Sequence, residues 1–364
     1  MKIAFVSTRG IPNNYGGFEE FAERLGERLA RRGHEVTVYN PSFHPFRDEQ
    51  HNGVRVVRVF SPETTIGTAA NFIFDYLSFR HAVKKEKCDA VIVCGYTTAA
   101  VSFLVCGFGR STVLTNMDGI EWKRSKWSPA IQGLAKRFEK IAAERSTALI
   151  ADNAGIAEHI KSEYGKESFF ISYGAVPFRD PDQSRLAELD LDPFGYNLLV
   201  GRMEPENNFE MVLDGARIGG LPTVVVSSTD TKYGRELTKK YSATGARFIG
   251  WIGEREMLSN LRHFAAVHFH GHSVGGTNPS LLEAMACGAF VAAHDNIFNR
   301  SVLGEDALYF SDAAEVAAIV KNAAALTEKR ENFTAQNLVK INETYNWNRI
   351  ADQYEKMLFE VTGN

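Results

Sequence analysis

Residues 268–288 read HFHGHSVGGTNPSLLEAMACG, and this stretch carries the most informative strand-to-helix junction of the chain. An apolar run from Ala266 to Phe269 leads into it and predicts a buried strand. A polar, glycine-rich turn follows, and Pro279 suits the first turn of a helix, where its missing N–H is not needed. Glu283 comes one turn into that helix among small and apolar residues. Its carboxylate can accept hydrogen bonds from a hydroxyl of a ligand there, or it can simply face solvent.

Short apolar runs alternate with helix-period segments on both sides of this junction. Such alternation predicts a parallel sheet covered by helices on both faces. The pattern breaks between residues 172 and 194, where glycine, proline and aspartate gather, so we place a domain junction there. The expected strands are 2–7, 35–39, 54–60, 89–94, 111–115 and 148–151 before the junction, and 197–200, 223–226, 247–249, 266–269 and 290–293 after it.

Two similar halves predict an α/β fold of two Rossmann-like, doubly wound domains facing a central cleft. The expected domain limits are residues 1–175 and 176–345. Residues 346–364 are expected to form a C-terminal helix that packs back toward the first domain, because WNRIADQYEKMLFEV repeats apolar residues at helical spacing. In such folds the ligand lies at the carboxyl ends of the strands.

Composition narrows the class of protein. Of the 364 residues 44% are hydrophobic and 23% charged, a globular balance that excludes a disordered chain. With 41 Lys and Arg against 44 Asp and Glu, the chain lacks the basic excess of a general nucleic-acid binder, so we expect no nucleic-acid partner. No apolar run approaches the ~18 residues of a membrane-spanning helix, and no signal peptide begins the sequence. The four cysteines have no CxxC spacing, so we expect a cytoplasmic protein without a zinc site or disulfides.

The first strand-to-helix turn, TRGIPNNYGGF at residues 8–18, contains a glycine pair. Gly16 and Gly17 fall at the start of the first helix, where free N–H groups and the helix dipole suit an anion. The loop lacks the glycine order of a dinucleotide site and the lysine of a P-loop, so a purely conformational role of the pair stays open.

The matching turn of the second half is VGRMEPENNF at residues 200–209. It follows a strand and precedes a helix, which places Arg202 at the carboxyl edge of the sheet. A guanidinium there can hold a pyrophosphate with two parallel hydrogen bonds. The alternative is a surface arginine paired with Glu204 or Glu206.

Taken in order, these features resemble the retaining glycosyltransferases of family 4, which have the two-Rossmann B-type fold. The similarity covers nearly the whole chain and rests on the glycine pair, the GR turn at 201–202, the LLEAMACG block at 281–288 and the terminal helix at 347–361. The loops TRGIPNNYGGFEEFAE, DGIEWKRSKW, GRMEPENNFEM and HSVGGTNPSLLEAM look most like a bacterial subgroup that includes rhamnosyltransferases for surface polysaccharides. The resemblance implies that the first domain is the acceptor side and the second binds the nucleotide-sugar.

Two positions depart from the family pattern. Gly275 stands where the family usually has a glutamate eight residues before Glu283, and Asn207 stands where it has a lysine five residues after Arg202. In the family the glutamate contacts the donor sugar and the lysine its diphosphate, so losing both suggests an inactive enzyme in a typical member. The same substitutions characterise the subgroup, which favours altered recognition of the donor.

The resemblance also implies roles for individual residues. Arg202 acts on the leaving diphosphate, and Glu283 binds the ribose. Asp118, where many relatives carry a His or Asp that touches the donor sugar, binds a sugar hydroxyl, or else it caps the following turn. The other donor-side candidates are Gly16, Gly17, Asn207, Asn208, Gly276, Thr277, Asn278 and Leu282, and the acceptor-side candidates are Tyr15, Glu121 and His272.

Retaining enzymes of this fold are thought to let the acceptor attack on the face that the nucleotide leaves, so they need no protein nucleophile. Catalysis is then positioning plus stabilisation of the leaving diphosphate. The sequence agrees with this, because it contains no GxSxG, HExxH or DxD motif. We expect a metal-independent reaction without a cofactor, in which Arg202 and helix dipoles take the place of a cation.

A basic and aromatic segment follows Asp118. It combines two tryptophans with cations and can rest on an anionic membrane, or it can be a solvated basic face. The resemblance points to an undecaprenyl-diphosphate-linked acceptor and to peripheral contact at the inner face of the cell membrane. The residues concerned are Trp122, Lys123, Arg124, Lys126, Trp127, Lys136, Arg137, Lys140 and Arg145.

The resemblance therefore implies a hexosyltransferase-type enzyme of bacterial surface polysaccharide synthesis. The expected donor is dTDP-rhamnose first and a UDP-sugar second, and the acceptor is a glycan or lipid-linked glycan. Two rivals stay open: a sugar-nucleotide epimerase of the same fold, and a non-catalytic nucleotide- or glycan-binding homologue, which Gly275 and Asn207 would explain. A nicotinamide oxidoreductase fits less well, because the first turn lacks the dinucleotide glycine order.

Overall fold

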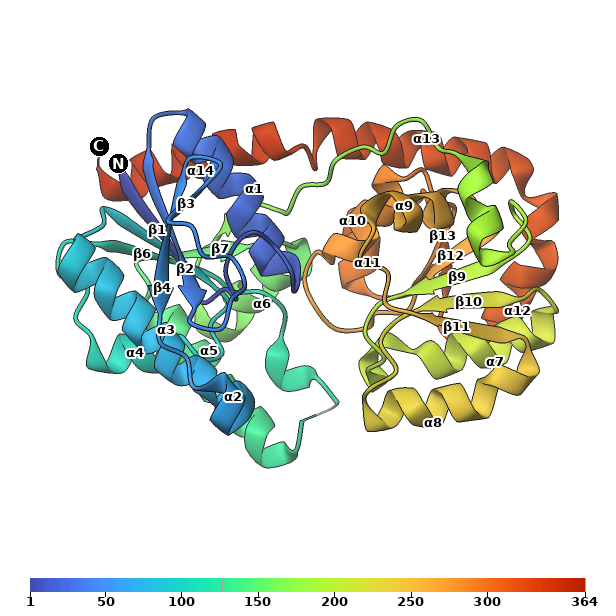
Figure 1. The fold of residues 1–364 in the computed structure, drawn as a ribbon, viewed down its shortest axis with the longest axis horizontal. Coiled ribbons are helices and arrows are strands. Elements are labelled where there is room, and N and C mark those ends of the chain that lie inside the picture. The colour runs from blue at the N-terminus through green and yellow to red at the C-terminus, as the bar shows by residue number, and fades with distance from the viewer. Residues whose placement is uncertain (126, 364) are drawn as a thin grey trace. The chain divides into compact units, whose positions relative to one another are not determined.

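The computed structural model describes residues 1–125 and 127–363, and the structural statements below concern these residues. The chain divides into two compact units, each with its own sheet (Figure 1). Unit 1 comprises Met1–Lys123, Trp127–Tyr173 and the described residues from Trp347 onward. Unit 2 comprises Gly174–Asn346 together with the short segment that begins at Arg124.

The sheet of unit 1 has eight strands, and all neighbours run parallel except one antiparallel pair at its edge, β3 with β4. The central strands are buried almost throughout, as apolar strands covered on both faces should be. The spatial order is β3 (Gln50–His51), β4 (Val54–Val59), β2 (Glu35–Pro41), β1 (Lys2–Val6), β5 (Ala90–Cys94), β6 (Thr112–Asn116), β7 (Ala148–Ala151) and β8 (Phe169–Phe170).

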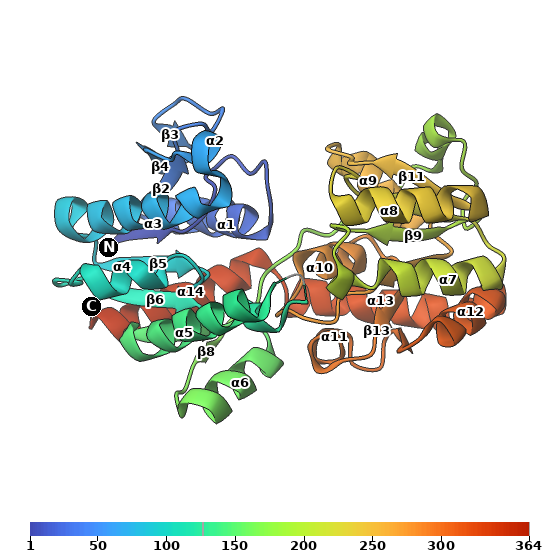
Figure 2. The ribbon, with the colours of Figure 1, turned by 90° about the horizontal axis from the view of Figure 1, so that it is seen from below.

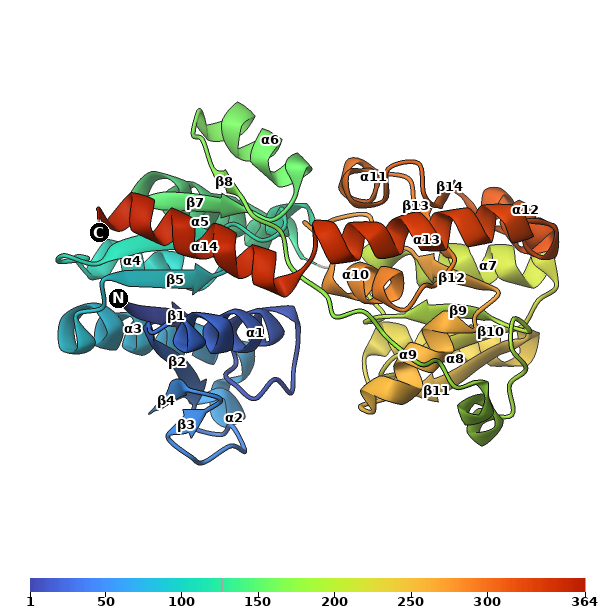
Figure 3. The ribbon, with the colours of Figure 1, turned by 90° about the horizontal axis from the view of Figure 1, so that it is seen from above.

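Helices cover both faces of this sheet. Helices α1 (Gly17–Arg31) and α14 (Trp347–Thr362) lie over one face (Figure 3). Over the other lie α3 (Ala70–Arg80), α4 (Ala100–Val105) and α5 (Pro129–Arg145) (Figure 2). The remaining helical segments are α2 (Glu63–Ile66), α6 (Ala154–Tyr164), the 3-10 turns Gly67–Ala69 and Glu121–Lys123, and a π-helical turn, His81–Glu86, that continues α3.

Helix α14 is held on unit 1 by charged and apolar contacts. The Glu355 carboxylate lies 2.9 Å from the guanidinium of Arg32 and 2.9 Å from the imidazole of His34. Tyr354 is fully buried, and its ring centroid lies 5.4 Å from that of Phe21 on α1. The helix at the carboxyl end of the chain is therefore part of the core of unit 1.

The sheet of unit 2 has six parallel strands. One apolar cluster packs α7, α8 and α12 on one face, and a second packs α9 on the other. The strand order is β11 (Ala246–Gly250), β10 (Thr223–Val226), β9 (Asn197–Val200), β12 (Val267–His270), β13 (Val291–His294) and β14 (Leu308–Phe310).

The helices of unit 2 are arranged on the two faces as in unit 1 (Figures 2 and 3). Among the described residues, none of the helices of the chain is both long and apolar enough to span a bilayer. The helices of unit 2 are α7 (Phe209–Gly219), α8 (Lys232–Tyr241), α9 (Arg255–His263), α10 (Pro279–Ala286), α11 (Ile297–Leu303), α12 (Ala313–Asn322) and α13 (Thr327–Glu343), with 3-10 turns at Gln183–Leu189, Pro205–Asn207, Ser242–Thr244 and Ala323–Ala325.

Candidate functional site

The loop after β9 presents Arg202 at the carboxyl edge of the unit 2 sheet. Its side chain is 69% exposed, and the guanidinium lies 3.9 Å from the Glu204 carboxylate. This separation is too long for a hydrogen bond. The ion pair that the sequence offered as an alternative is thus present only loosely. Most of the guanidinium surface remains available to an anionic ligand.

The two asparagines that follow, both candidates for donor binding, fix this loop from inside. The side-chain nitrogen of Asn207 donates to the Arg202 carbonyl at 2.8 Å, and that of Asn208 donates to the Gly271 carbonyl at 2.8 Å. Asn207 is buried, and Asn208 has a left-handed φ of 52° just before α7. Their amide nitrogens therefore position the arginine and tie its loop to the loop after β12.

The loops after β9 and β12 touch each other directly. A Cβ added to Gly271 would lie 2.2 Å from the Asn207 carbonyl oxygen, so only glycine permits this approach. Ser273 strengthens the junction, because both its N–H and its hydroxyl donate to the Glu206 carbonyl, at 3.0 and 2.8 Å. Arg202 and the turn before α10 consequently belong to one rigid edge of the sheet.

His272, an acceptor-side candidate, lies in that junction. Its ring stacks on His270 with centroids 4.4 Å apart and planes at 12°. Burial, together with the charges of Arg202 and Arg124, lowers the pKa of His272 to about 3. The imidazole is therefore neutral, able to donate or accept a hydrogen bond but not to serve as a cation. His268 and His270 are fully buried in β12, which agrees with the interpretation of strand histidines as packed groups.

The turn before α10 begins the helix with a side-chain cap. The Asn278 carboxamide oxygen accepts from the Ser280 N–H at 2.9 Å, and Pro279 takes the first helical position. Thr277 is buried beside them, and Gly275 adopts a φ of 141°. The side-chain oxygen of Asn278 is thus used to cap the helix. The donor-side candidates of this turn, Gly276 included, therefore offer a ligand chiefly backbone groups.

Leu282 differs from Glu283 in burial. Its side chain has no exposed surface and is buried in unit 2, so only its backbone could contact a donor, and its place among the donor-side residues stays a prediction. The reason is helical geometry, because the side chains of neighbouring residues 282 and 283 point about 100° apart on α10. Glu283 is the one of the two that reaches the surface.

Glu283 pairs with an arginine that sequence reasoning missed. One Glu283 carboxylate oxygen lies 2.6 Å from the guanidinium of Arg262 on α9, which also donates to the Ser280 hydroxyl at 3.1 Å. The Arg262 side chain is 5% exposed and that of Glu283 is 39% exposed. A buried arginine needs a carboxylate partner, so the arginine between Leu261 and Phe264 was the available signal.

A second group of charges in unit 2 pairs Arg124 with two glutamates, which the sequence analysis did not predict. The Arg124 guanidinium lies 3.7 Å from the Glu204 carboxylate and 3.8 Å from that of Glu206. The Ser125 hydroxyl donates to Glu206 at 3.1 Å. Arg124 is therefore engaged by acidic groups rather than presented as a free surface cation. Lys126, predicted to belong to the same basic segment, lies outside the described residues.

In unit 1, the carboxyl ends of β1, β5 and β6 lie side by side, because Val6 pairs with Val93 and Cys94 with Asn116. The residues that follow two of these strands have left-handed backbone conformations although they are not glycine. Ser7 has a φ of 63° and Asp118 a φ of 51°. Such conformations cost free energy and concentrate at functional sites, so this edge is the candidate site of unit 1.

Asp118 has its carboxylate unused at this edge. Its N–H donates to the Asn116 side chain at 3.0 Å, but among the described residues its carboxylate accepts no hydrogen bond. The turn-capping alternative is therefore not observed. Glu121 opens the 3-10 turn Glu121–Lys123, and its N–H donates to the Tyr96 hydroxyl at 3.1 Å.

The start of α1 holds a carboxylate of the protein itself. The Glu19 side chain is 3% exposed and accepts from the Arg9 N–H at 2.6 Å. A Cβ on Gly16 would lie 3.3 Å from the second Glu19 oxygen. The anion-binding position predicted at Gly16 and Gly17 is thus lined by a carboxyl group of the protein, whose pKa is raised by burial. Tyr15 beside it is 63% exposed.

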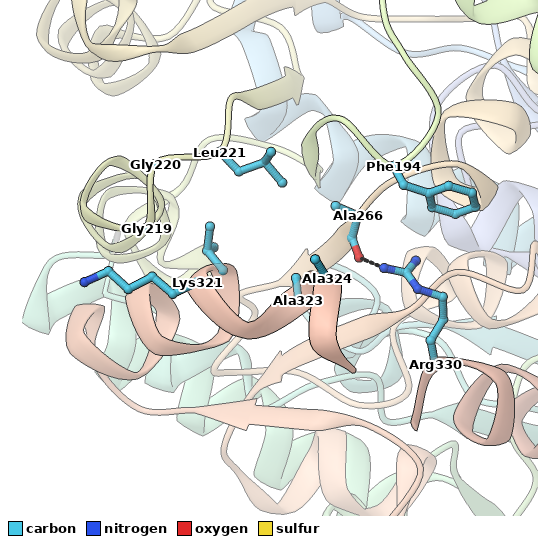
Figure 4. A pocket seen from close by; sticks show the side chains of 10 residues that line it. Phe194, Gly219, Gly220, Leu221, Ala266, Lys321, Ala323, Ala324 and Arg330 are labelled. Atoms are coloured by element: carbon cyan, nitrogen blue, oxygen red, sulfur yellow. Dashed lines mark hydrogen bonds between the residues drawn. The ribbon is translucent and has the colours of Figure 1, made fainter. Parts of the chain in front are cut away.

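A cavity of about 270 Å³ in unit 2 lies away from these loops. Ala266 and Leu221 line it just before β12 and β10 begin, at the amino ends of the strands (Figure 4). Arg330 points into the wall and donates to the Ala266 carbonyl at 2.6 Å and to the Ala265 carbonyl at 3.1 Å. Two cations line this cavity, Lys321 and Arg330, and Arg330 is already bonded to the backbone.

Comparison with known proteins supports the assignment of the fold. Residues 1–176 match the family model described as "Domain of unknown function (DUF1972)", and residues 210–356 match the model described as "Glycosyl transferase-like". No curated protein sequence matches the chain. Residues 210–356 thus form a glycosyltransferase-like domain.

Several solved structures share the whole two-sheet architecture. Sucrose-phosphate synthase from Thermosynechococcus elongatus superposes with a TM-score of 0.84 at 18% identity, over 100% of this chain and 99% of that one. The Anabaena protein Alr3699/HepE, solved with UDP and glucose, gives 0.77 at 16% identity over 99% and 100%. The α,α-trehalose 6-phosphate synthase from Burkholderia multivorans gives 0.73 at 11% identity over 100% and 99%. The chain therefore has the B-type glycosyltransferase fold, as its sequence predicts.

Proposed function

We propose that the chain is a retaining glycosyltransferase that uses a nucleoside diphosphate sugar. The observation that carries the proposal is the edge of unit 2, within and beside the glycosyltransferase-like domain. There an exposed arginine, the start of α10 and a half-exposed carboxylate come from loops that are bonded together. Structures with the same fold were solved with UDP and with UDP-glucose. An arginine and helical N–H groups suit the diphosphate, and a carboxylate suits ribose hydroxyls.

In this proposal the protein positions groups rather than reacting itself. Arg202 and the N–H groups at the start of α10 stabilise the negative charge that develops on the leaving diphosphate. The acceptor hydroxyl forms the new bond to the anomeric carbon on the face that the diphosphate leaves, and its proton passes to the diphosphate. Asp118 holds a sugar hydroxyl. The positive charge of Arg202 takes the place of a metal ion, so chelation with EDTA is expected to leave the rate unchanged.

We propose dTDP-rhamnose as the first donor to test and a UDP-sugar as the second. The UDP found with HepE supports the second choice. The purified chain should be melted with dTDP, UDP, GDP and NAD in parallel. A ligand at ~100 times its Kd adds about 2.7 kcal/mol of stability, which raises the melting temperature by several degrees. A shift with dTDP or UDP selects the donor for a transfer assay, and a shift with NAD alone would refute the proposal.

A non-catalytic homologue remains the second candidate, and one observation favours it. Asn207 stands in place of the lysine usual in the similar family, and its side-chain nitrogen donates to the Arg202 carbonyl instead of to a ligand. Such a homologue would bind nucleotide without consuming a donor in the presence of any acceptor. An epimerase would consume the donor without an acceptor, so the same assay separates all three readings.

We further propose that the acceptor is lipid-linked and that unit 1 rests on the inner face of the cell membrane. Exposed aliphatic side chains on α5 and α3 support this, since Ile131, Leu134 and Ile73 are each at least 40% exposed. Arg137 and Lys140 on α5 are exposed beside them. Apolar side chains flanked by cations suit an anionic bilayer surface.

Co-sedimentation with phosphatidylglycerol vesicles tests the membrane contact. The triple variant with Lys123, Arg137 and Lys140 changed to glutamate is expected to lose sedimentation. A control that changes the exposed Lys232 and Lys239 of unit 2 to glutamate should keep it. Absence of sedimentation for the unaltered protein would contradict the proposal.

A further inference from the structure

A buried carboxylate in unit 1 lies at the centre of a hydrogen-bond network that the proposed reaction does not use. The Glu139 side chain, on α5, is 2% exposed. One of its oxygens accepts from the His159 imidazole at 2.7 Å and from the Tyr164 hydroxyl at 2.6 Å, both on α6. The other accepts from the Tyr96 hydroxyl at 2.9 Å. Helices α5 and α6 lie beside each other in Figure 2.

The network keeps its central group charged. Burial alone would raise the pKa of Glu139, but the hydrogen bonds from His159 and Tyr164 hold it below its ordinary value. Burial also raises the pKa of Tyr96 well above its ordinary value, so its hydroxyl retains the proton that it donates. A hydrogen bond to a carboxylate is stronger than one between neutral groups, and this fixes the orientation of the Tyr96 hydroxyl.

The same hydroxyl reaches the loop that carries Asp118. While it donates to Glu139, the Tyr96 oxygen accepts from the N–H of Glu121 at 3.1 Å. Tyr96 is 1% exposed and follows β5, whereas Glu121 belongs to the loop after β6. A second contact supports the loop, because the indole of Trp122 lies 6.2 Å from the ring of His159.

We propose that Tyr96 and Glu139 are positioning residues that fix loop 117–123, and through it Asp118, for the reaction. Asp118 has a left-handed backbone conformation, which persists only where the surrounding structure enforces it. The Tyr96 hydroxyl connects this loop to the layer of α5 and α6 by hydrogen bonds, beside the ring contact of Trp122 with His159. The part played in the reaction rests on the proposed glycosyltransferase function, whereas the fixing of the loop does not.

The test is Tyr96→Phe, which removes one oxygen and leaves the ring. Hydrogen exchange of the Glu121 amide, measured on the full chain without substrate, is expected to speed up about threefold. This is less than the ~10-fold of a fully lost hydrogen bond, because the same N–H also donates to the Gly119 carbonyl at 2.9 Å. The matched control is Tyr39→Phe. Tyr39 is another buried tyrosine of unit 1, on β2, and its hydroxyl bonds His81 at 3.0 Å. That control should leave the Glu121 amide unchanged. Glu139→Gln provides a second variant with the same expected direction if Tyr96→Phe fails to fold.

The transfer assay then tests the role in the reaction. Tyr96→Phe is expected to lower kcat/KM about tenfold while the Kd for the nucleotide stays unchanged, because the nucleotide is assigned to unit 2. Unchanged exchange at Glu121 in a folded variant would overturn the proposal. Faster exchange with unchanged kcat/KM would overturn the link to the reaction. An unaltered protein that transfers no sugar would instead count against the proposed function, since the exchange result does not depend on it.

Discussion

Replacing Glu283 with glutamine tests how strongly unit 2 depends on the pair that this residue forms with Arg262. The substitution keeps the size of the side chain but removes the charge 2.6 Å from the guanidinium. Removing one member of a buried ion pair costs ~3–5 kcal/mol, because the other charge stays desolvated. Arg262 is 5% exposed but Glu283 is 39% exposed, so water screens this pair. We therefore expect a loss of about 2 kcal/mol in the free energy of unfolding.

Urea unfolding and thermal melting measure this loss. For a domain of about 150–250 residues, 2 kcal/mol lowers the melting temperature by about 4–8 °C. A double-mutant cycle with Arg262→Met, Glu283→Gln and both changes isolates the pair, and we expect a coupling of about 2 kcal/mol. Asp295→Asn, which breaks the exposed pair with Arg300, is the control and should cost less than about 1 kcal/mol. A coupling below about 0.5 kcal/mol for the buried pair would refute the reasoning.

The same variants separate the structural role of Glu283 from its role toward a ligand. If its carboxylate binds ribose, Glu283→Gln weakens nucleotide binding by about 1–3 kcal/mol even when Arg262 is already methionine. Isothermal titration with dTDP and UDP measures this. An affinity that falls only in the presence of Arg262 would show that Glu283 acts through its partner, and the ribose assignment would be wrong.

Three further changes have expected outcomes. Arg202→Ala should lower sugar transfer at least several-fold and leave the melting temperature unchanged, because this side chain is 69% exposed; full activity would remove it from the diphosphate site. Gly271→Ala should cost ~1–3 kcal/mol of stability and weaken nucleotide binding, since the new Cβ would lie 2.2 Å from the Asn207 carbonyl; an unchanged melting curve contradicts this. Burial raises the pKa of Asp75 from 3.8 to about 7, so the native state binds the additional proton between these values and stability falls as the pH rises through them. Asp75→Asn should remove this fall, as urea unfolding at several pH values would show.

Eleven of the strands were predictable from sequence because parallel strands buried on both faces are continuous apolar runs, whereas the short strands β3, β8 and β14 were not predicted. Strands β9 and β10 have the bounds expected from their runs, Asn197–Val200 and Thr223–Val226. Helices α8 (KYGRELTKKY) and α9 (REMLSNLRH) were not predicted, because each exposes a wide polar face and carries few apolar residues. The amphipathic pattern of these two helices is recognisable only once the sheet that their apolar side chains cover is known.

The candidate site was predictable only in part, and for a related reason. The place of Arg202 follows from its position between a strand and a helix, which local sequence determines. The partner of Glu283 does not, because Arg262 on α9 meets it only through the packing of the chain. Glu19, by contrast, lies three residues after Gly16 in the first turn of α1, so its place beside the glycine pair is local. Charge pairing across elements depends on distances that no local pattern encodes.

The membership of α14 in unit 1 has a consequence for synthesis. Its contacts with Arg32, His34 and Phe21 join the two ends of the described chain, yet the whole of unit 2 is translated between them. The apolar face of α1 that Tyr354 covers therefore stays uncovered during translation until α14 has emerged from the ribosome. Nascent chains stalled before Trp347 should present that face to chaperones and proteases, whereas the core of unit 2 can already be complete.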